Sequence, residues 1–446
     1  MSRPEVSPLL TDLYQLTMIQ GYLEHGMTGP ASFELFARKL PKGRNFLLAC
    51  GLEQALQYLE TLRFSPEELD WLDATGRFSP ALLDWLEGLN FDGDVDAMPE
   101  GTVFFPDEPM LRVTASLPLA QLVETRLINI LHFQTLIASK AARARLAAPG
   151  KLLVDFGLRR AHGAEAGLMA ARAAWVAGFD GTSNVLAGMR FGMPIMGTMA
   201  HSWVLAHDSE RESFLHFART HPEQTVLLID TWDTERGARI AAEAAAELAR
   251  EGIRVRGVRL DSGDLGEHAR KVRRILDAAG LQEATIFASG NLDERRIEAL
   301  EASGAPIDGY GVGTRMVTSS DAAYLDCAYK LQEYAGTPRR KLSEGKATWP
   351  GRKQVWRHRK EGRMDFDILG LADETHAGEP LLKPVLRRGQ RLVPPESLDA
   401  IRERARRELD ALTPACRALD GGAPVLVRVS GQLQELAREV DAALRG

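Results

Sequence analysis

The chain of 446 residues is long enough for two or three domains of ordinary size, and 45% of it is apolar and 26% charged. This composition is typical of a globular protein and excludes a largely disordered or fibrous one. The 55 basic and 61 acidic residues are mixed along the sequence and give a net charge of −6. We therefore expect no nucleic-acid partner, and any anion site must be local.

The sequence carries no recognisable export or membrane signal. Its start has no apolar run of the length of a signal peptide, and no stretch approaches the roughly 18 uncharged apolar residues of a membrane helix. The three cysteines lie far apart, without the paired spacing of a disulfide framework or a zinc site. We expect a cytoplasmic protein with no membrane partner.

The N-terminal part of the chain predicts an α+β domain over residues 1–135. In residues 9–23 leucine and isoleucine recur at helical spacing, and Asp12 lies in the first turn, where the helix dipole favours a carboxylate. Beyond this first helix, the pattern predicts further helices and strands in alternation. These are helices at 52–62 and 80–89, and strands near 101–105 and 110–115.

After Gly150 short β-rich runs alternate with helical stretches. Helices at 236–251 and 265–279, each followed by glycine, are typical of the crossover connections of a parallel sheet. The predicted strands are residues 152–156, 179–182, 195–199, 226–229, 255–260, 285–288 and 310–312. This is one strand fewer than a regular barrel has, so we expect an irregular (β/α) barrel over residues 136–335.

The C-terminal part of the chain interrupts this alternation. Residues 336–363 form a basic, turn-rich stretch, and a strand at 424–429 and a helix at 432–444 follow later. We assign residues 336–446 to a segment that packs with the N-terminal domain, so that both ends of the chain build one additional α+β domain.

Polar residues follow every predicted barrel strand. Barrel enzymes place their catalytic groups at these strand ends. Glycines beside hydroxyls offer backbone N–H groups to phosphate, arginines bind anions, and aspartates bind Mg²⁺ or ribose hydroxyls. The segments are 155–160, 181–184, 197–201, 230–234, 259–264, 289–291 and 311–315. Together they predict an active site for a phosphorylated sugar with a metal ion.

Two of these segments are candidates for phosphate binding. Residues 289–291 and 311–314 enter helices or turns, where unpaired amides favour anions, although such glycines also mark tight turns. Nucleotide motifs are not formed, because Met316 stands where a dinucleotide fingerprint needs its third glycine, and residues 345–347 lack the hydroxyl of a P-loop. If ATP is used, another kind of site binds it.

Three motifs carry a resemblance to a known family, in the family's order. They are Asp-Phe-Gly-Leu-Arg-Arg at 155–160, Gly-Thr-Met-Ala-His at 197–201 and Arg-Leu-Asp-Ser-Gly-Asp at 259–264. With Thr-Asp-Leu-Tyr-Gln at 11–15 and the basic stretch around 350–353, the sequence resembles nicotinate phosphoribosyltransferase over much of its length.

The resemblance implies the type II phosphoribosyltransferase fold and a homodimer with shared active sites. The implied reaction joins nicotinate to phosphoribosyl pyrophosphate and yields nicotinate mononucleotide and pyrophosphate, in NAD biosynthesis or salvage. It also implies Mg²⁺, and ATP as a co-substrate whose hydrolysis passes through a phosphorylated histidine.

His201 matches that histidine. A neutral imidazole is nucleophilic near neutral pH, whereas a lone histidine elsewhere would more often be a packed core residue. For the pyridine, the resemblance implies that Phe156 stacks on the ring, Arg159 faces its carboxylate and Tyr14 closes the site from the partner subunit. Tyr14 reads equally well as packing on an amphipathic helix.

Ser183 bears on the choice of pyridine. The related nicotinamide enzymes resemble this stretch but carry an aspartate there, which would accept from an amide and repel a carboxylate. Serine at this position favours the acid.

The remaining polar residues are assigned to phosphoribosyl pyrophosphate and its metal. Asp230 and Asp261 are the candidates for metal, ribose or pyrophosphate, and Asp261 and Arg259 join His201 as catalytic candidates. Catalysis would rest on positioning the ring nitrogen and stabilising the leaving group. Further candidates are Ser289, Gly290, Asn291, Gly311, Gly313, Thr314, Arg315, Thr198 and Lys140, the last of which also reads as part of a solvent-exposed basic face.

Three other functions stay open at this point. A nicotinamide or quinolinate phosphoribosyltransferase would share the barrel, although Ser183 argues against nicotinamide. A Schiff-base aldolase would need a lysine at a strand end, and no predicted strand ends on one. A non-catalytic phosphosugar-binding barrel would not account for His201 among so many anion-binding groups.

Overall fold

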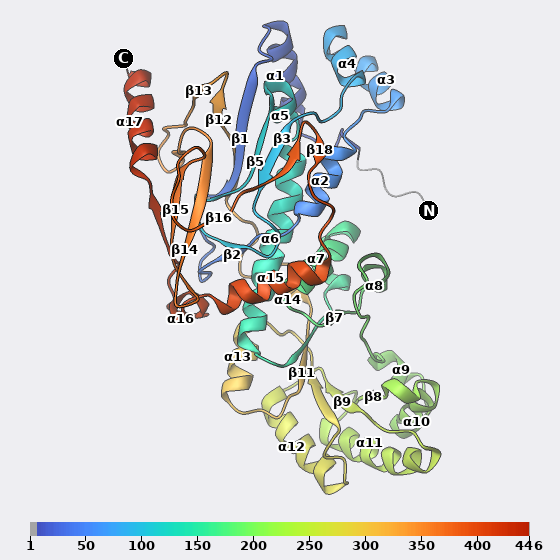
Figure 1. The fold of residues 1–446 in the computed structure, drawn as a ribbon. Coiled ribbons are helices and arrows are strands. Elements are labelled where there is room, and N and C mark those ends of the chain that lie inside the picture. The colour runs from blue at the N-terminus through green and yellow to red at the C-terminus, as the bar shows by residue number, and fades with distance from the viewer. Residues whose placement is uncertain (1–6, 446) are drawn as a thin grey trace. The chain divides into compact units, whose positions relative to one another are not determined.

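The computed structural model describes residues 7–445 and divides into two compact units (Figure 1). One unit contains the described residues up to Ser139 and those from Tyr324 onward, and the other is Lys140–Ala323. The first unit is therefore built from both ends of the chain, as expected for the additional α+β domain. The divisions fall after Ser139 and after Ala323, whereas we predicted boundaries after residues 135 and 335.

A seven-stranded sheet joins the two ends of the chain in the first unit. Residues 30–37 form a strand that pairs antiparallel with one strand from the N-terminal part and one from the C-terminal part. The sheet order is β13 (Thr337–Pro338), β12 (Cys327–Tyr334), β1 (Pro30–Ala37), β5 (Pro109–Ser116), β3 (Asp94–Ala97), β17 (Lys383–Arg387) and β18 (Gln390–Arg391). Strand β1 is almost wholly buried, because neighbouring strands flank both of its edges and side chains pack on both of its faces.

A second sheet corrects the prediction for residues 336–363. Strands β14 (Lys353–Lys360) and β15 (Arg363–Leu371) form a hairpin where we predicted a turn-rich interruption. The remaining strands of this sheet are β16 (Glu379–Pro380) and β19 (Leu426–Val429), and a separate pair is β2 (Leu47–Leu48) with β4 (Val103–Phe104). The prediction failed because this stretch is rich in basic and turn-forming residues and shows no clear strand pattern, whereas Arg357 is fully buried and paired with Asp367 and Glu408.

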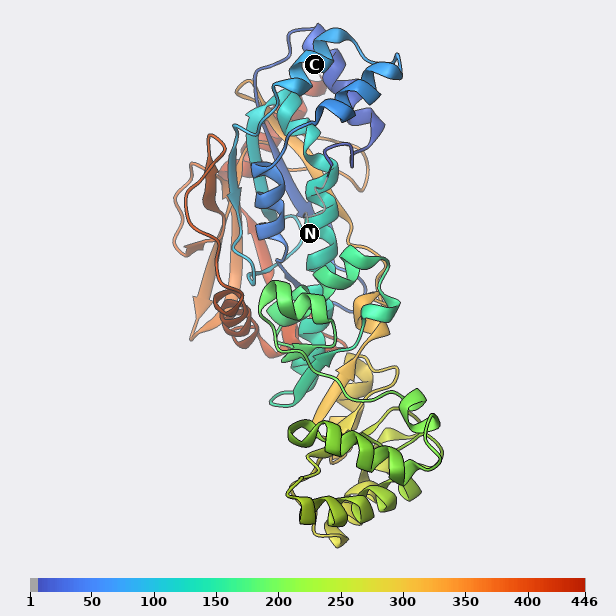
Figure 2. The same cartoon turned by 90° about the vertical axis from the view of Figure 1, so that its right-hand side faces the viewer.

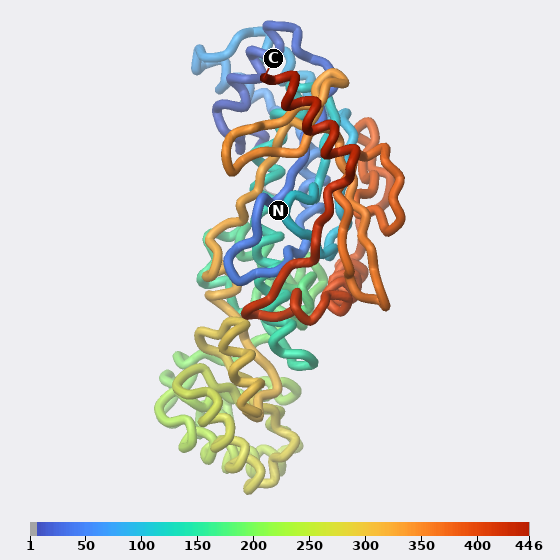
Figure 3. The backbone as a smooth tube through the Cα atoms, turned by 90° about the vertical axis from the view of Figure 1, so that its left-hand side faces the viewer, coloured from blue at the N-terminus to red at the C-terminus, as the bar shows by residue number. Residues whose placement is uncertain are grey.

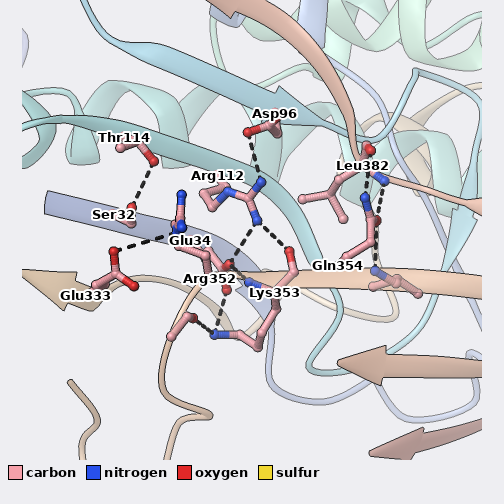
Figure 4. A network of polar contacts seen from close by, with 12 residues as sticks. Ser32, Glu34, Asp96, Arg112, Thr114, Glu333, Arg352, Lys353, Gln354 and Leu382 are labelled. Atoms are coloured by element: carbon pink, nitrogen blue, oxygen red, sulfur yellow. Dashed lines mark hydrogen bonds and ion pairs between the residues drawn. The ribbon is translucent and has the colours of Figure 1, made fainter. Parts of the chain in front are cut away.

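A buried ion-pair network connects β14 with the seven-stranded sheet (Figure 4). Lys353 Nζ lies 2.8 Å from a carboxylate oxygen of Glu34, and Lys353 N donates to the same carboxylate. Arg112 donates to the carbonyl oxygen of Lys353 and to Asp96. Burial lowers the pKa of Lys353, and the charge of Glu34 opposes that shift. The network therefore fixes the register between strands that are far apart in the sequence.

Helices surround these sheets. They are α1 (Leu13–Glu24), α2 (Leu52–Glu60), α3 (Pro66–Ala74), α4 (Pro80–Glu87), α5 (Leu117–Leu122), α6 (Glu124–Ala147), α15 (Leu398–Asp410), α16 (Pro414–Arg417) and α17 (Gly431–Arg445). The C-terminal helix α17, red in Figure 3, packs on β15. Among the described helices, including the long α6, none has the length and apolar character needed to span a membrane.

The second unit is an open parallel α/β barrel (Figure 2). Its sheet order is β7 (Gly181–Thr182), β6 (Leu152–Asp155), β11 (Gly309–Val312), β10 (Thr285–Ala288), β9 (Gly257–Leu260) and β8 (Val226–Leu228). The irregular barrel is thus confirmed. The strand predicted at 195–199 is wrong, because in the described chain only Ile195 makes a bridge, to Thr182.

The strands of this unit are connected mainly by helices. These are α7 (Ala164–Val176), α8 (Val185–Phe191), α9 (His201–Leu205), α10 (Glu210–Thr220), α11 (Thr234–Leu248), α12 (Leu265–Ala278), α13 (Glu294–Ala302) and α14 (Thr314–Val317), with short 3-10 turns at Leu158–Arg160, Pro222–Gln224 and Ala249–Glu251. Helices α11 and α12 pack against the sheet, and the strand ends of the sheet meet at one face. This face carries the predicted site.

Candidate active site

Aspartates that follow the barrel strands fall into two groups with different roles. Asp233, Asp264 and Asp293 each accept a hydrogen bond from a backbone N–H in the first turn of the helix that follows. They are helix N-caps, which explains their position without any ligand. Asp261 directly follows β9, and Asp230 lies two residues after β8. Neither caps a helix, so both are candidates for binding a ligand or metal.

Asp230 links the ends of two neighbouring strands. Its Oδ2 accepts from the backbone N–H of Asp261 at 2.8 Å and from the hydroxyl of Ser262 at 2.6 Å. Its Oδ1 is buried and accepts no hydrogen bond within the described chain. An unpaired buried carboxylate oxygen is costly, so Oδ1 is available for a cation or a hydroxyl group of a substrate.

His201 lies close to this pair. Its Nδ1 is 3.1 Å from the hydroxyl of Thr231, and its Nε2 is 4.0 Å from a carboxylate oxygen of Asp261. The side chains of His201 and Asp261 are both 40% exposed, so reagents from solvent can reach them. Thr231 fixes one ring nitrogen, and the other faces the carboxylate across a gap.

Arg259 lies beside the predicted pyridine site. Its Nη1 donates to the hydroxyl of Thr198 at 2.6 Å, and its guanidinium lies 6.0 Å from the centre of the Phe156 ring. Burial lowers the pKa of Arg259, while the charges of Asp261 and Asp230 raise it. The Nε of Arg259 is buried without a partner in the described chain, so this side chain keeps a donor for an anionic ligand.

The turn after β10 contacts Asp261. Ser289 donates to Asp261 Oδ1 at 2.5 Å. Gly290 has φ +92, and a Cβ there would lie 1.9 Å from the carbonyl oxygen of Asp261. Asn291 also adopts a left-handed conformation, and its side-chain oxygen accepts from Arg315. Glycine at 290 is therefore required by a close approach of two backbones.

The glycines after β11 have a packing explanation of their own. A Cβ on Gly311 would lie 2.5 Å from the Phe156 ring, and one on Gly313 would lie 2.8 Å from the Phe156 carbonyl oxygen. Thr314 opens the four-residue helix α14 and is exposed, while Arg315 forms an ion pair with Asp293 at 2.8 Å. Phosphate binding by these four residues stays a prediction.

Phe156, Arg159 and Ser183 come from neighbouring strand ends. Phe156 follows β6 and packs at 5.8 Å from the ring of Phe287. Arg159 is exposed in the turn Leu158–Arg160, and Ser183 is exposed directly after β7. Because β6 and β7 pair in parallel, these side chains belong to one corner of the barrel face.

Lys140 and Tyr14 do not follow the barrel strands, unlike the other predicted site residues. Lys140 is buried, with Nζ 2.7 Å from Glu294 and 2.8 Å from Asp321, so its charge is already neutralised. The reading of Lys140 as part of an exposed basic face is therefore wrong. Tyr14 lies on α1 of the other unit and is 47% exposed. Its predicted action across a subunit interface stays a prediction.

Two residues of the site were missed from the sequence. Thr231, the partner of His201, lies in the polar segment after β8, and its position next to Asp230 could have singled it out. Glu210 begins α10 and is only 4% exposed. Burial raises the pKa of Glu210 to about 7, with Arg236 lowering it and Asp230 raising it further. No sequence motif marks Glu210.

The site has the oxygen donors that Mg²⁺ prefers, but not a complete cage. No group of three or more potential metal-ligating side chains occurs within residues 7–445. Mg²⁺ commonly binds through one or two carboxylates together with substrate phosphates and water. The unpaired Oδ1 of Asp230 and the exposed carboxylate of Asp261 fit that mode of binding.

Comparison with family models gives matches along most of the chain. The N-terminal domain of nicotinate phosphoribosyltransferase matches residues 9–132, the nicotinate phosphoribosyltransferase family model matches 152–338, and the C-terminal domain model matches 375–437.

Individual proteins are also similar over most of the chain. Nicotinate phosphoribosyltransferase pncB2 of Mycobacterium tuberculosis is 48% identical, over 99% of this chain and 96% of its own. The nicotinate phosphoribosyltransferase of Bacillus subtilis is 41% identical, over 82% of this chain and 76% of its own. The crystal structure of human nicotinic acid phosphoribosyltransferase superposes with a TM-score of 0.88 at 32% identity, over 96% of this chain and 99% of that one.

Proposed function

Because the chain belongs to the nicotinate phosphoribosyltransferase family, we propose that it joins nicotinate to phosphoribosyl pyrophosphate at the carboxyl face of the open barrel. The observation that carries this proposal is the convergence of Phe156, Arg259, His201 and the Asp230–Asp261 pair on that face. An aromatic ring and a guanidinium suit an anionic pyridine, and the carboxylates suit a ribose and a metal-bound pyrophosphate.

In the proposed reaction the ring nitrogen of nicotinate attacks the anomeric carbon, and pyrophosphate leaves with the bonding electrons. Positive charge develops on the sugar, so the protein must position the nitrogen and stabilise the leaving group. Phe156 and Arg159 orient the pyridine, and Arg259 offers its unpaired donor to an anionic group. Asp230 and Asp261 would hold Mg²⁺, which when bound neutralises charge on the pyrophosphate.

We further propose that ATP is hydrolysed through His201. With Nδ1–H donated to Thr231, Nε2 is the free nucleophile. It would attack the terminal phosphorus of ATP, form a phosphoramidate and release ADP, and water would later break the N–P bond. The exposure of His201 and its opening toward Asp261 support access by a phosphate chain.

We also propose a cytoplasmic homodimer in which Tyr14 of each copy closes the pyridine site of the other. The Tyr14 side chain is 47% exposed, so a second copy of the chain could bury it. Analytical ultracentrifugation together with complementation tests this. Mixing Tyr14→Ala with His201→Ala should restore ATP-stimulated activity to some sites if they are shared, and no restoration on mixing would contradict sharing.

The experiment on function measures nicotinate mononucleotide from nicotinate and phosphoribosyl pyrophosphate with Mg²⁺, with and without ATP. Nicotinamide and quinolinate replace nicotinate in parallel reactions. We expect product from nicotinate only, with ATP stimulating its formation. Turnover of another pyridine in place of nicotinate would reassign the substrate.

The role of His201 is tested with His201→Ala, and with His216→Ala as a matched exposed histidine of the same unit. ATP stimulation and acid-labile labelling from terminally labelled ATP should disappear in His201→Ala and persist in His216→Ala. Labelling that survives in His201→Ala would refute the phosphohistidine and leave the transferase reaction intact.

A further inference from the structure

We propose that the buried pair Asp155–Thr182 is a positioning device for the pyridine substrate. It holds the turn that carries Phe156 and the strand end that carries Ser183 at a fixed separation. Asp155 and Thr182 act through the backbone and are positioning residues, not catalytic ones. This inference rests on the proposed function, because it concerns the nicotinate site.

The carboxylate of Asp155 bonds to two different elements. Its Oδ1 accepts from the backbone N–H of Gly157 at 2.8 Å, which shapes the turn directly after Phe156. Its Oδ2 accepts from the hydroxyl of Thr182 at 2.7 Å, at the end of the neighbouring strand β7. The Asp155 side chain thus connects the turn after β6 with the end of β7.

Backbone contacts extend this tie to Ser183. The N–H of Ser183 donates to the carbonyl oxygen of Asp155 at 2.9 Å. The hydroxyl of Thr182 accepts from the N–H of Asn184 at 3.0 Å, and Asn184 in turn caps α8 through the N–H of Ala187. Ser183 is therefore held between two fixed residues, although its own side chain is exposed.

Packing leaves little room for Phe156 to move. Gly311 and Gly313 are both places where an added Cβ would collide with Phe156. A turn that slipped would consequently shift the ring as well as its backbone. Displacements near 1 Å at a substrate-orienting group are enough to cost large factors in rate or binding.

The choice of an acid at position 155 supports a role in orientation. Asp155 is 2% exposed, and its partners in the described chain are a hydroxyl and a backbone N–H, with no charged group among the causes of its pKa shift. Burial raises the pKa of Asp155, and the bonds from Thr182 and Gly157 oppose that rise. A buried carboxylate without an ion pair is costly, but it accepts strong hydrogen bonds from both neighbours at once, which specifies their geometry.

The test compares Thr182→Val with Thr182→Ser. Valine has the shape of threonine without the hydroxyl, and serine keeps the hydroxyl. At saturating phosphoribosyl pyrophosphate, we expect Thr182→Val to raise the KM for nicotinate about tenfold. The KM for phosphoribosyl pyrophosphate should stay within about twofold, and Thr182→Ser should behave like the wild type in both.

Thr225→Val is the matched control. Thr225 is also fully buried and donates to a main-chain oxygen at 2.9 Å, but it lies at the opposite, amino end of β8. The Thr225→Val variant should have a lower midpoint of thermal unfolding and an unchanged KM for nicotinate. If Thr182→Val does not fold, Thr182→Ala replaces it, because alanine also lacks the hydroxyl that donates to Asp155.

The outcomes separate the two proposals. A wild-type enzyme that makes no nicotinate mononucleotide would sink the proposed function before any variant is assayed. An active wild type with an unchanged nicotinate KM in Thr182→Val, or with both KM values raised equally, would overturn the positioning role alone. A selective rise in the nicotinate KM that serine reverses supports it.

Discussion

Replacing Glu210 with glutamine should make the protein more stable at neutral pH. Glu210 is 4% exposed, and one of its oxygens accepts no hydrogen bond within the described chain. The start of a helix ordinarily favours a carboxylate. Here burial outweighs that effect and raises the pKa of Glu210 to about 7.

The direction and the magnitude of this effect of Glu210 on stability follow from the linkage between protonation and folding. An unfolded glutamate titrates near pH 4.5, so between about pH 4.5 and 7 the folded chain holds a proton that the unfolded chain has lost. The contribution of Glu210 to stability is therefore present below pH 4.5 and lost as pH rises through 7. At roughly 1.4 kcal/mol for each pKa unit between about 4.5 and about 7, the complete loss is about 3.5 kcal/mol.

Urea unfolding of the wild type and of Glu210→Gln from pH 5 to pH 8 measures this loss. The free energy of unfolding of the variant, relative to the wild type, should rise by about 2 kcal/mol across the series. Glu243→Gln, an exposed residue on α11, is the control and should show no such slope. A difference between Glu210→Gln and wild type that is flat or falls with pH would refute the reasoning.

Three further predictions test the site and the other unit. Ser183→Asp should lower kcat/KM for nicotinate at least about tenfold, because it sets a negative charge against the substrate carboxylate; unchanged kinetics would contradict our account of selectivity. Lys353→Met leaves the charge of Glu34 buried without the ammonium at 2.8 Å, so the free energy of unfolding should fall by about 3 kcal/mol; a loss below about 1 kcal/mol would contradict it. Gly290→Ala places a Cβ 1.9 Å from a main-chain oxygen and should raise the KM for phosphoribosyl pyrophosphate more than about tenfold, whereas Gly280→Ala, with φ +78 and open space, should only lower the unfolding midpoint.

The barrel was predictable because its signals are local. The strand at 285–288 was predicted with the bounds that the structure has, since it is a short apolar run between two glycine-marked turns. The polar segments after the strands were found in the same way, and parallel pairing brings them to one face. By contrast, Ile195 was assigned to a strand on its apolar neighbours, but it meets Thr182 at a single bridge.

The first unit was less predictable because long-range contacts decide its structure. Strand β1 was missed, although Ser32 and Glu34 alternate with apolar residues, and both of these polar residues are buried in the sheet. Helix α6 was missed because it is buried around much of its circumference. The burial of Arg357 and Lys353 was not predicted, because it depends on ion pairs with Asp367 and Glu34 that only the folded structure reveals.

The structure supplies a physical reason for choosing Asp230 and Asp261 as site candidates over their neighbours. Asp233 and Asp264 follow the same two strands, and their hydrogen bonds show that they cap helices. The contact between Thr231 and His201 likewise depends on how two loops meet, which no spacing reveals.

The first unit is interrupted in sequence by the barrel segment, and this affects how the chain folds during synthesis. Strand β1 emerges early, but its neighbour β12 follows only after the entire segment Lys140–Ala323 has been made. The barrel unit is contiguous and can complete its core first. Until β12 arrives, one edge of β1 has no partner, and unpaired strand edges recruit other chains. Slowing synthesis within the barrel segment should therefore favour aggregation of the nascent protein, even though the barrel itself would be folded.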